Sequence, residues 1–256
     1  MERRVFEARF RVGNTEPGFS RPCTKHFVVN QNAPPDQIRA DSETAIAFDR
    51  LIDWGIGVLL GVVGLLGSLG GAALYYAVDH ADIATAIRNG EFRSDILTEA
   101  EAIDALFALS QWSGIGLVVA GGLTMLIGIT VVVAHGRARK AGRGTPRWIL
   151  GVVGAVVGIV LGFIPFSPAL GGAAAGYLDP ARNASGAGSG TLAGVFASLP
   201  LVIVAGFAGV GLFLGLPGEV AVTVAVVLAV ALLVSLAYLV VLSAIGGYLG
   251  GWMRER

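Results

Sequence analysis

Few side chains of this sequence have the types and spacing that chemistry needs. Asp53, His80 and His135 each stand at the border of a long apolar segment rather than at its middle, where proton and ion relays lie. Cys23 and His26 could bind a metal ion, but two ligands do not complete a zinc site. The catalytic motifs HExxH, GxSxG and the P-loop are absent from the sequence. The sequence therefore predicts no enzyme activity, no catalytic residue, no metal site and no cofactor.

A predicted helix break at Pro165 and Pro168 is the other place where chemistry is conceivable. Each proline removes an amide donor and disfavours helix for the residue before it, so a straight helix through 148–178 is not expected. Carbonyl groups freed at such a break bind ions or solutes in transporters, although a purely structural kink is the favoured interpretation. We favour one kinked helix that crosses the membrane. The alternative is a hairpin of two short helices that returns to its starting side.

Long apolar segments must position this break. Each is long enough for an α-helix to cross a bilayer, which takes about 20 residues. They hold almost no ionisable side chain and cover residues 54–78, 112–134, 148–178, 192–216 and 219–252. Composition agrees, since 54% of the residues are hydrophobic and the mean hydropathy is +0.73. We expect an all-α, polytopic integral membrane protein of about five transmembrane helices, one of them broken by proline.

The charges between these segments orient the chain. Residues 135–147 carry five cations and no acid, namely Arg137, Arg139, Lys140, Arg143 and Arg147. Residues 79–110 carry seven acids against two arginines. Because Lys and Arg favour the cytoplasmic side, we expect a multi-pass protein of the cell membrane with 135–147 and the N-terminus in the cytoplasm. The kinked crossing puts residues 179–191 and the C-terminus outside, whereas the hairpin keeps both inside. Anionic-lipid binding is the alternative role of 135–147.

The chain divides at these charged connections. Residues 1–45 mix Arg, Phe and Pro without a period and predict a disordered cytoplasmic tail. Residues 46–134 predict a two-helix transmembrane hairpin with an acidic extracellular loop at 79–110. The basic linker 135–147 then leads to a glycine-rich membrane domain at 148–256.

The acidic loop has structure of its own. Asn89 and Gly90 predict a turn between two short helical stretches. Thr98 and Glu101 have the spacing of a capping box, which predicts the start of a helix. This helix is amphipathic, so we expect it to lie on the lipid headgroups. A docking face for an extracellular partner is the alternative.

Glycine predicts how the helices pack. The chain has 38 glycines in 256 residues, about twice the usual share. Small residues four positions apart let helix backbones approach closely in lipid. The strongest pattern is the triple Gly154, Gly158 and Gly162, followed by the pairs Gly172/Gly176 and Gly246/Gly250. We expect packing within the chain, with homo-oligomerisation through the same face as the alternative.

The C-terminal half resembles a known family. The likeness rests on the stretch from Trp148, on Pro165-Phe-Ser-Pro168, on the GGxxxGY element from Gly171 to Tyr177, and on Leu242–Gly251. Residues 148–252 thereby resemble a family of small haloarchaeal membrane domains of unknown function. The spacer after Tyr177 is looser and less acidic than in that family. The resemblance implies a family but no activity.

These observations favour a non-enzymatic membrane packing or interaction protein. The alternative is a small permease-like transporter or channel for a small neutral solute, either as a single chain or as an oligomer. Its lining would have to come from the hydroxyls of the apolar segments: Ser110, Ser113, Thr124, Thr130, Ser167, Ser198, Thr223, Ser235 and Ser243. The expected partners are membrane lipids and either a second copy or another membrane protein. Nucleic acid is not expected.

Overall fold

The computed structural model describes residues 35–90, 96–141, 146–179 and 186–255. Residues 46–256 form one compact unit, and the described residues 35–45 fall outside it. The described residues are all-helical and contain no strand, which confirms the predicted fold class. Of the tail predicted for residues 1–45, residues 1–34, with Cys23 and His26, lie outside the described residues.

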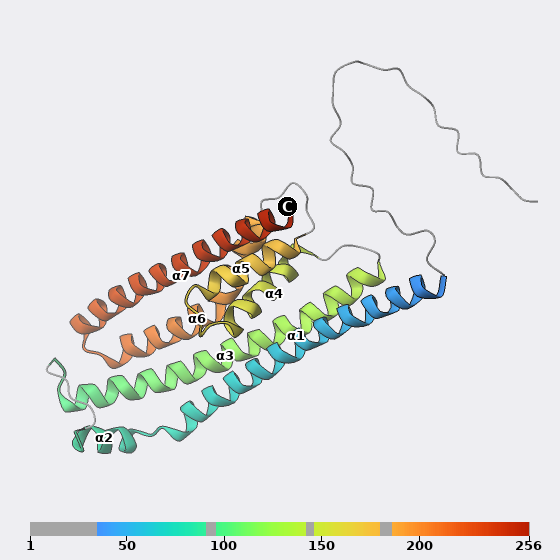
Figure 1. The fold of residues 1–256 in the computed structure, drawn as a ribbon. Coiled ribbons are helices and arrows are strands. Elements are labelled where there is room, and N and C mark those ends of the chain that lie inside the picture. The colour runs from blue at the N-terminus through green and yellow to red at the C-terminus, as the bar shows by residue number, and fades with distance from the viewer. Residues whose placement is uncertain (1–34, 91–95, 142–145, 180–185, 256) are drawn as a thin grey trace, which may run out of the picture. The chain divides into compact units, whose positions relative to one another are not determined.

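Seven helices make up the described residues, and four of them are long and apolar enough to cross a membrane (Figure 1). The helices are α1 (Pro35–Ala77), α2 (His80–Arg88), α3 (Glu99–Lys140), α4 (Arg147–Val160), α5 (Ser167–Leu178), α6 (Ala187–Gly215) and α7 (Gly218–Glu255). The candidate spans are Trp54–Ala77, Glu99–Ala138, Ala187–Gly215 and Gly218–Arg254. This is compatible with a multi-pass membrane protein. The prediction of about five spans is not confirmed.

The four long helices alternate in direction along the chain. In α1 and α3, Gly57 lies against Val132 and Gly71 lies against Gly114, so residue numbers fall in one helix as they rise in the other. The contacts between α3 and α6, and between α6 and α7, show that these two pairs of helices are antiparallel as well. One end of the bundle therefore holds the end of α3, the start of α6 and the end of α7. We call it the basic end, and we call the opposite end, with α2 and the start of α3, the acidic end.

Helices α4 and α5 form a hairpin rather than one kinked helix. Gly154 lies against Gly171 and Ala175, so the two short helices are antiparallel. At their outer ends, Arg147 Nε lies 3.6 Å from Asp179 Oδ2. Both ends of the hairpin are thus together at the basic end. The favoured kinked crossing is therefore wrong, because the chain turns back at the break, and the alternative hairpin is what forms.

Proline chemistry explains where the hairpin turns. Pro165 has no amide to continue α4, and Pro168 stands within the first two positions of α5, where a missing amide costs no helical bond. Between them Phe166 has a φ of 65°, the left-handed conformation that non-glycine residues seldom adopt. Successive short-range bonds close the turn, including those from the Ile164 amide to the Leu161 carbonyl at 2.8 Å and from Ser167 to Ile164 at 3.1 Å.

The acidic end confirms the two local signals in its loop. Helix α2 ends just before Asn89, and Gly90 has a φ of 78°, as a turn requires. The capping box is formed, since the Thr98 amide donates to Glu101 Oε2 at 2.9 Å. The predicted headgroup helix is wrong, however, because α3 runs without interruption from this cap to Lys140. Ile103 is buried there, and the first turns of α3 pack against the end of α6.

Helix α1 begins earlier than predicted. It starts at Pro35, inside the segment 1–45 that was expected to be irregular. Proline is favourable at the first helical position, where its missing amide would have no partner, and the residues that follow include good helix formers.

Candidate functional site

A cavity lies where the α4–α5 hairpin breaks. Its volume is about 200 Å³, and its walls come from α4, α5, α6 and α7. Small side chains form most of the lining, which consists of Gly154, Ala155, Gly158, Ile159, Gly162, Ser167, Pro168, Ala193, Ala197, Leu239 and Ser243. The cavity brings hydroxyl groups from two helices to the break in the hairpin. This combination of a broken helix and convergent polar groups makes it the candidate site.

The two hydroxyl groups have different surroundings. Ser243 Oγ donates to the Pro168 carbonyl at 2.9 Å, and Ser243 is 2% exposed. This bond ties α7 to the first turn of α5. Ser167 is 9% exposed, and its amide donates to the Ile164 carbonyl. Among the described residues, no hydrogen bond engages the Ser167 hydroxyl, which leaves it available to whatever occupies the cavity.

Glycines hold α5 and α7 at the distance that the Ser243 bond needs. Gly172 faces the backbone of Ser243, and Gly176 faces that of Gly247. From the other side, Gly246 faces Ala169 and Gly250 faces Ala173. A Cβ added at any of these four glycines would lie within 3 Å of backbone atoms of the opposite helix. The absence of side chains on both surfaces therefore permits this close contact.

The glycine triple of α4 does not act as one uniform surface. A Cβ at Gly154 would lie 2.8 Å from the Cβ of Ala175, so this position packs tightly. A Cβ at Gly158 would lie 3.5 Å from the Ser167 carbonyl oxygen, an ordinary contact at the wall of the cavity. Gly162 lies beyond the end of α4 in the turn. This triple was the strongest glycine pattern in the sequence, whereas the closest approach of helices among the described residues is between α5 and α7.

The described members of the predicted basic cluster lie at one end, and one of them pairs across the base of the hairpin. Arg137 and Lys140 are exposed at the end of α3. The Arg139 side chain and Arg143 lie outside what the structure describes. Arg147 pairs with Asp179, whose side chain is only 4% exposed. Sequence analysis missed Asp179. The signal was present, because an acid directly follows the apolar stretch 148–178 and an arginine directly precedes it.

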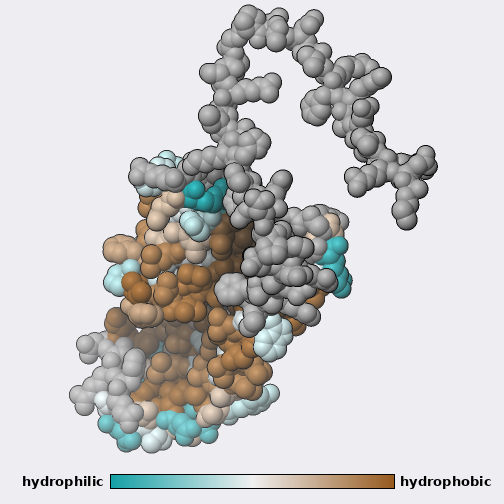
Figure 2. Space-filling model, turned by 45° about the vertical axis from the view of Figure 1, so that its right-hand side comes forward, coloured by the Kyte–Doolittle hydropathy of each residue, from teal (hydrophilic) through white to brown (hydrophobic). Residues whose placement is uncertain are grey.

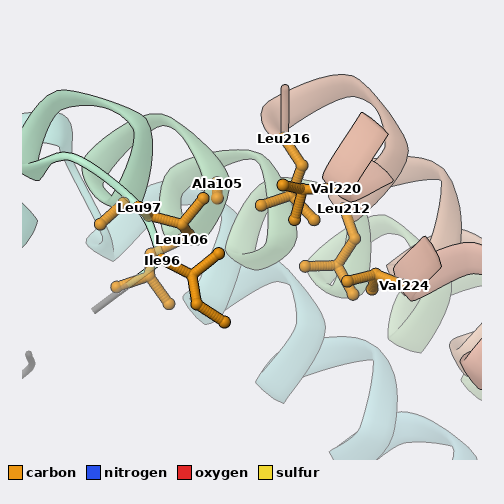
Figure 3. A pocket seen from close by; sticks show the side chains of 9 residues that line it. Ile96, Leu97, Ala105, Leu106, Leu212, Leu216, Val220 and Val224 are labelled. Atoms are coloured by element: carbon orange, nitrogen blue, oxygen red, sulfur yellow. The ribbon is translucent and has the colours of Figure 1, made fainter. Parts of the chain in front are cut away.

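Other cavities offer little polar chemistry. One of about 260 Å³ at the acidic end is lined by apolar side chains alone, with Leu97 and Leu106 on one side and Leu212 and Leu216 on the other (Figure 3). A wider groove of about 370 Å³ between α1, α3, α4 and α6 contains Thr124, whose hydroxyl already donates within α3. Figure 2 shows one face covered largely by hydrophobic residues, as lipid contact requires.

The residues first considered for chemistry do not meet in one place. His80 Nε2 lies 3.0 Å from Asp104 Oδ1 at the acidic end, with both side chains more than half exposed. His135 belongs to α3 near the basic end, and the Asp53 side chain is outside what the structure describes. Within the described ranges, no three His, Cys, Asp or Glu side chains gather as metal ligands would.

Residues 148–253 match the model of a family of unknown function, DUF5518. This confirms the predicted resemblance of the C-terminal half to such a family. The matched region contains α4 to α7 and therefore every residue that lines the cavity at the break, whereas α1 to α3 lie outside it. No curated protein and no solved structure matches the chain.

Proposed function

We propose that this protein is a membrane permease or channel that lets a small uncharged solute cross, and that the solute binds at the break between α4 and α5. The observation that carries the proposal is the hairpin itself. Its two ends are paired at the basic end through Arg147 and Asp179. A membrane protein tolerates such a non-helical turn at depth where it is buried or lines a cavity.

The break lies about halfway along the neighbouring long helices. Ile159, near the end of α4, borders the same pocket as Pro200, which stands near the middle of α6. If α6 crosses the bilayer, the turn of the hairpin is then at the level of the bilayer centre. A solute that enters from either side would meet the cavity midway, the position of the binding sites in many transporters.

The lining supports an uncharged solute. It contains no ionisable side chain, and its polar groups are two hydroxyls and backbone atoms. A charged group at the centre of a bilayer is costly unless an opposite charge or several dipoles compensate it. The long helices also carry their charges near their ends, with Glu219 at the start of α7 and Arg254 at its finish.

The charge distribution supports an orientation. The end of α3 carries Arg137 and Lys140, and the start of α4 carries Arg147. The positive-inside rule places this basic end in the cytoplasm and the acidic end outside. In this orientation the hairpin enters and leaves the membrane from the cytoplasmic side.

The test is solute flux through the purified full-length protein in liposomes. The vesicles receive an osmotic step, and light scattering follows their volume as they shrink and then swell with the entry of water, glycerol or urea. Wild-type vesicles should swell faster than protein-free vesicles in at least one neutral solute. Gly158→Leu and Ala197→Leu fill the cavity from α4 and from α6 and should both abolish the difference. Gly206→Leu is the matched control, because a Cβ there meets nothing within 4 Å. If the wild-type protein accelerates the entry of none of these solutes into the vesicles, the proposal is overturned.

A packing or interaction role is the second candidate. It is favoured by the exposed apolar surface of α7, where Val230, Leu233 and Val234 are each more than half exposed. Lipid, a second copy or another membrane protein would cover this surface. Purification from the native membrane under mild conditions distinguishes the two candidates. A stoichiometric partner together with no solute flux supports the interaction role.

A further inference from the structure

The geometry points to a small polyol as the solute, with Ser167 as the residue that recognises it through its hydroxyl group. This inference rests on the proposed permeation function and names the substrate class of that same cavity. It is drawn from the hydrogen-bonding groups that the break leaves available, from the volume of the cavity, and from the distribution of its polar and apolar walls.

The start of α5 does not suit an anion. The first amides of a helix normally have no partner and bind anions well. Here the Ser167 amide donates to the Ile164 carbonyl at 3.1 Å, Pro168 has no amide hydrogen, and the Ala169 amide donates to Phe166 at 2.9 Å. The amides that usually hold an anion are therefore occupied or missing.

The cavity is also a poor binding site for a metal cation. Cations in proteins need several oxygen ligands, usually including carboxylates or a ring of carbonyls. The cavity lining holds no carboxylate. The Pro168 carbonyl at its wall already accepts the hydrogen bond from Ser243. Neutral molecules remain as the class that this lining can recognise.

The two serines offer a pattern that suits a hydroxyl group. A serine hydroxyl has one donor hydrogen and two acceptor lone pairs. Ser243 uses its hydrogen on Pro168 and keeps only acceptor capacity, whereas Ser167 keeps both. A solute hydroxyl can accept from Ser167 and donate to Ser243. Urea is a poorer match, because its carbonyl oxygen only accepts and its nitrogen atoms only donate, so no single atom of urea can pair with both serines.

The remaining walls of the cavity suit the C–H groups of a polyol. The cavity of about 200 Å³ is lined on its other sides by Gly154, Ala155, Ala193 and Ala197. Since water occupies about 30 Å³ in the liquid, the volume corresponds to roughly six waters or one compact molecule with as many heavy atoms. Glycerol has this size, with hydroxyls along one edge and C–H groups along the other.

Ser243 is a positioning residue in this arrangement. Its bond to Pro168 fixes the first turn of α5, and the close contact between Gly172 and the Ser243 backbone keeps α7 beside it. Removing the Ser243 hydroxyl takes away this bond between α7 and α5, so it should lower both stability and flux. Removing the Ser167 hydroxyl should change recognition while the fold stays intact.

The experiment compares glycerol and urea flux in liposomes that contain the full-length protein. Wild type should favour glycerol, Ser167→Ala should lower glycerol flux about three- to tenfold, the effect of one hydrogen bond, and Ser167→Thr should restore it. Ser235→Ala is the matched control, because Ser235 does not line the cavity and its hydroxyl donates to the Ala231 carbonyl within α7. The melting temperature of each variant in detergent separates a change in recognition from loss of the fold.

The outcomes distinguish this inference from the proposed function. A wild-type protein that passes urea as fast as glycerol, or a folded Ser167→Ala variant with wild-type glycerol flux, overturns the polyol inference and leaves the permeation function standing. If Ser167→Ala does not fold, loss of the glycerol preference in Ser167→Thr overturns the inference, and its retention supports it. A wild-type protein that passes neither solute overturns the polyol inference, and one that also fails to speed water overturns the permeation function as well.

Discussion

The contact between α5 and α7 predicts a large effect from a single methyl group. In Gly172→Ala the new Cβ would lie 2.6 Å from the Ser243 carbonyl carbon and 2.7 Å from its Cα. Both are backbone atoms, so no side chain can rotate away and the helices must separate by a large part of an ångström. A gap of that size forfeits about a quarter to a half of the dispersion energy between the facing atoms. The expected loss is about 1–3 kcal/mol, the range for overpacking a well-filled interior.

A second contribution comes from the hydrogen bond beside this contact. Ser243 donates to Pro168 at 2.9 Å, and separation of α5 from α7 would stretch that bond. Loss of one intramolecular hydrogen bond costs about 0.5–1.5 kcal/mol. The two effects act in the same direction, so Gly172→Ala should destabilise the protein although alanine is the better helix former.

Thermal unfolding in detergent measures this effect, with Gly206→Ala as the matched control. A Cβ at Gly206 meets nothing within 4 Å, so this substitution adds helix propensity without a clash. It should leave the melting temperature unchanged or raise it slightly, whereas Gly172→Ala should lower it clearly. Equal melting temperatures for the two variants would refute the reasoning, because the α5–α7 contact would then not be the tight one.

Three further predictions concern local features. Gly154→Ala should lower the melting temperature more than Gly158→Ala, because only the Gly154 methyl meets a close neighbour; the reverse order would contradict the packing described for α4. Thr98→Ala should cost about 1 kcal/mol in thermal unfolding through loss of the α3 cap, and no change would mean that the first turn of α3 does not limit stability. Arg147→Gln and Asp179→Asn should each destabilise, with a coupling on the order of 1 kcal/mol in a double-mutant cycle; additive losses would show that the 3.6 Å pair is not coupled.

Local chemistry explains what the sequence could predict. Trp54–Ala77, Ala187–Gly215 and Gly218–Arg254 overlap predicted spans, because length and apolarity are properties of one continuous segment. The break at Pro165 and Pro168 was predictable for the same reason, since a proline affects its own turn of helix. The capping box and the Asn89-Gly90 turn also depend on residues within a few positions of each other.

The direction of the chain after the break depends on distant residues. A kinked helix and a hairpin satisfy the two prolines equally well. The hairpin is held by Arg147 and Asp179 at its base, and by the bond from Ser243 to Pro168, which lie 75 positions apart in the sequence. Four-residue glycine spacing identified Gly172 and Gly246 as packing residues, but it could not tell which helices they would bring together.

The acidic end illustrates the opposite error. The amphipathic pattern after Thr98 predicted a helix on the headgroups, because polar and apolar residues alternate there with helical spacing. In the structure this pattern belongs to the first turns of α3, whose buried side includes Ile103 and faces the end of α6. The periodicity was read correctly, but a periodic face does not say whether lipid or another helix covers it.

Cysteine accessibility tests the central claim most directly, namely that the hairpin keeps both of its ends on one side of the membrane. Replacing the lone cysteine, Cys23→Ser, gives the background for single cysteines at Ala141, after α3, and at Met253, near the end of α7. A membrane-impermeant maleimide should label neither position in intact cells and both after permeabilisation, while a cysteine at Asn89 is labelled at once. Labelling of Ala141 and Met253 from opposite sides would contradict the hairpin, because it requires that residues 148–178 cross the membrane.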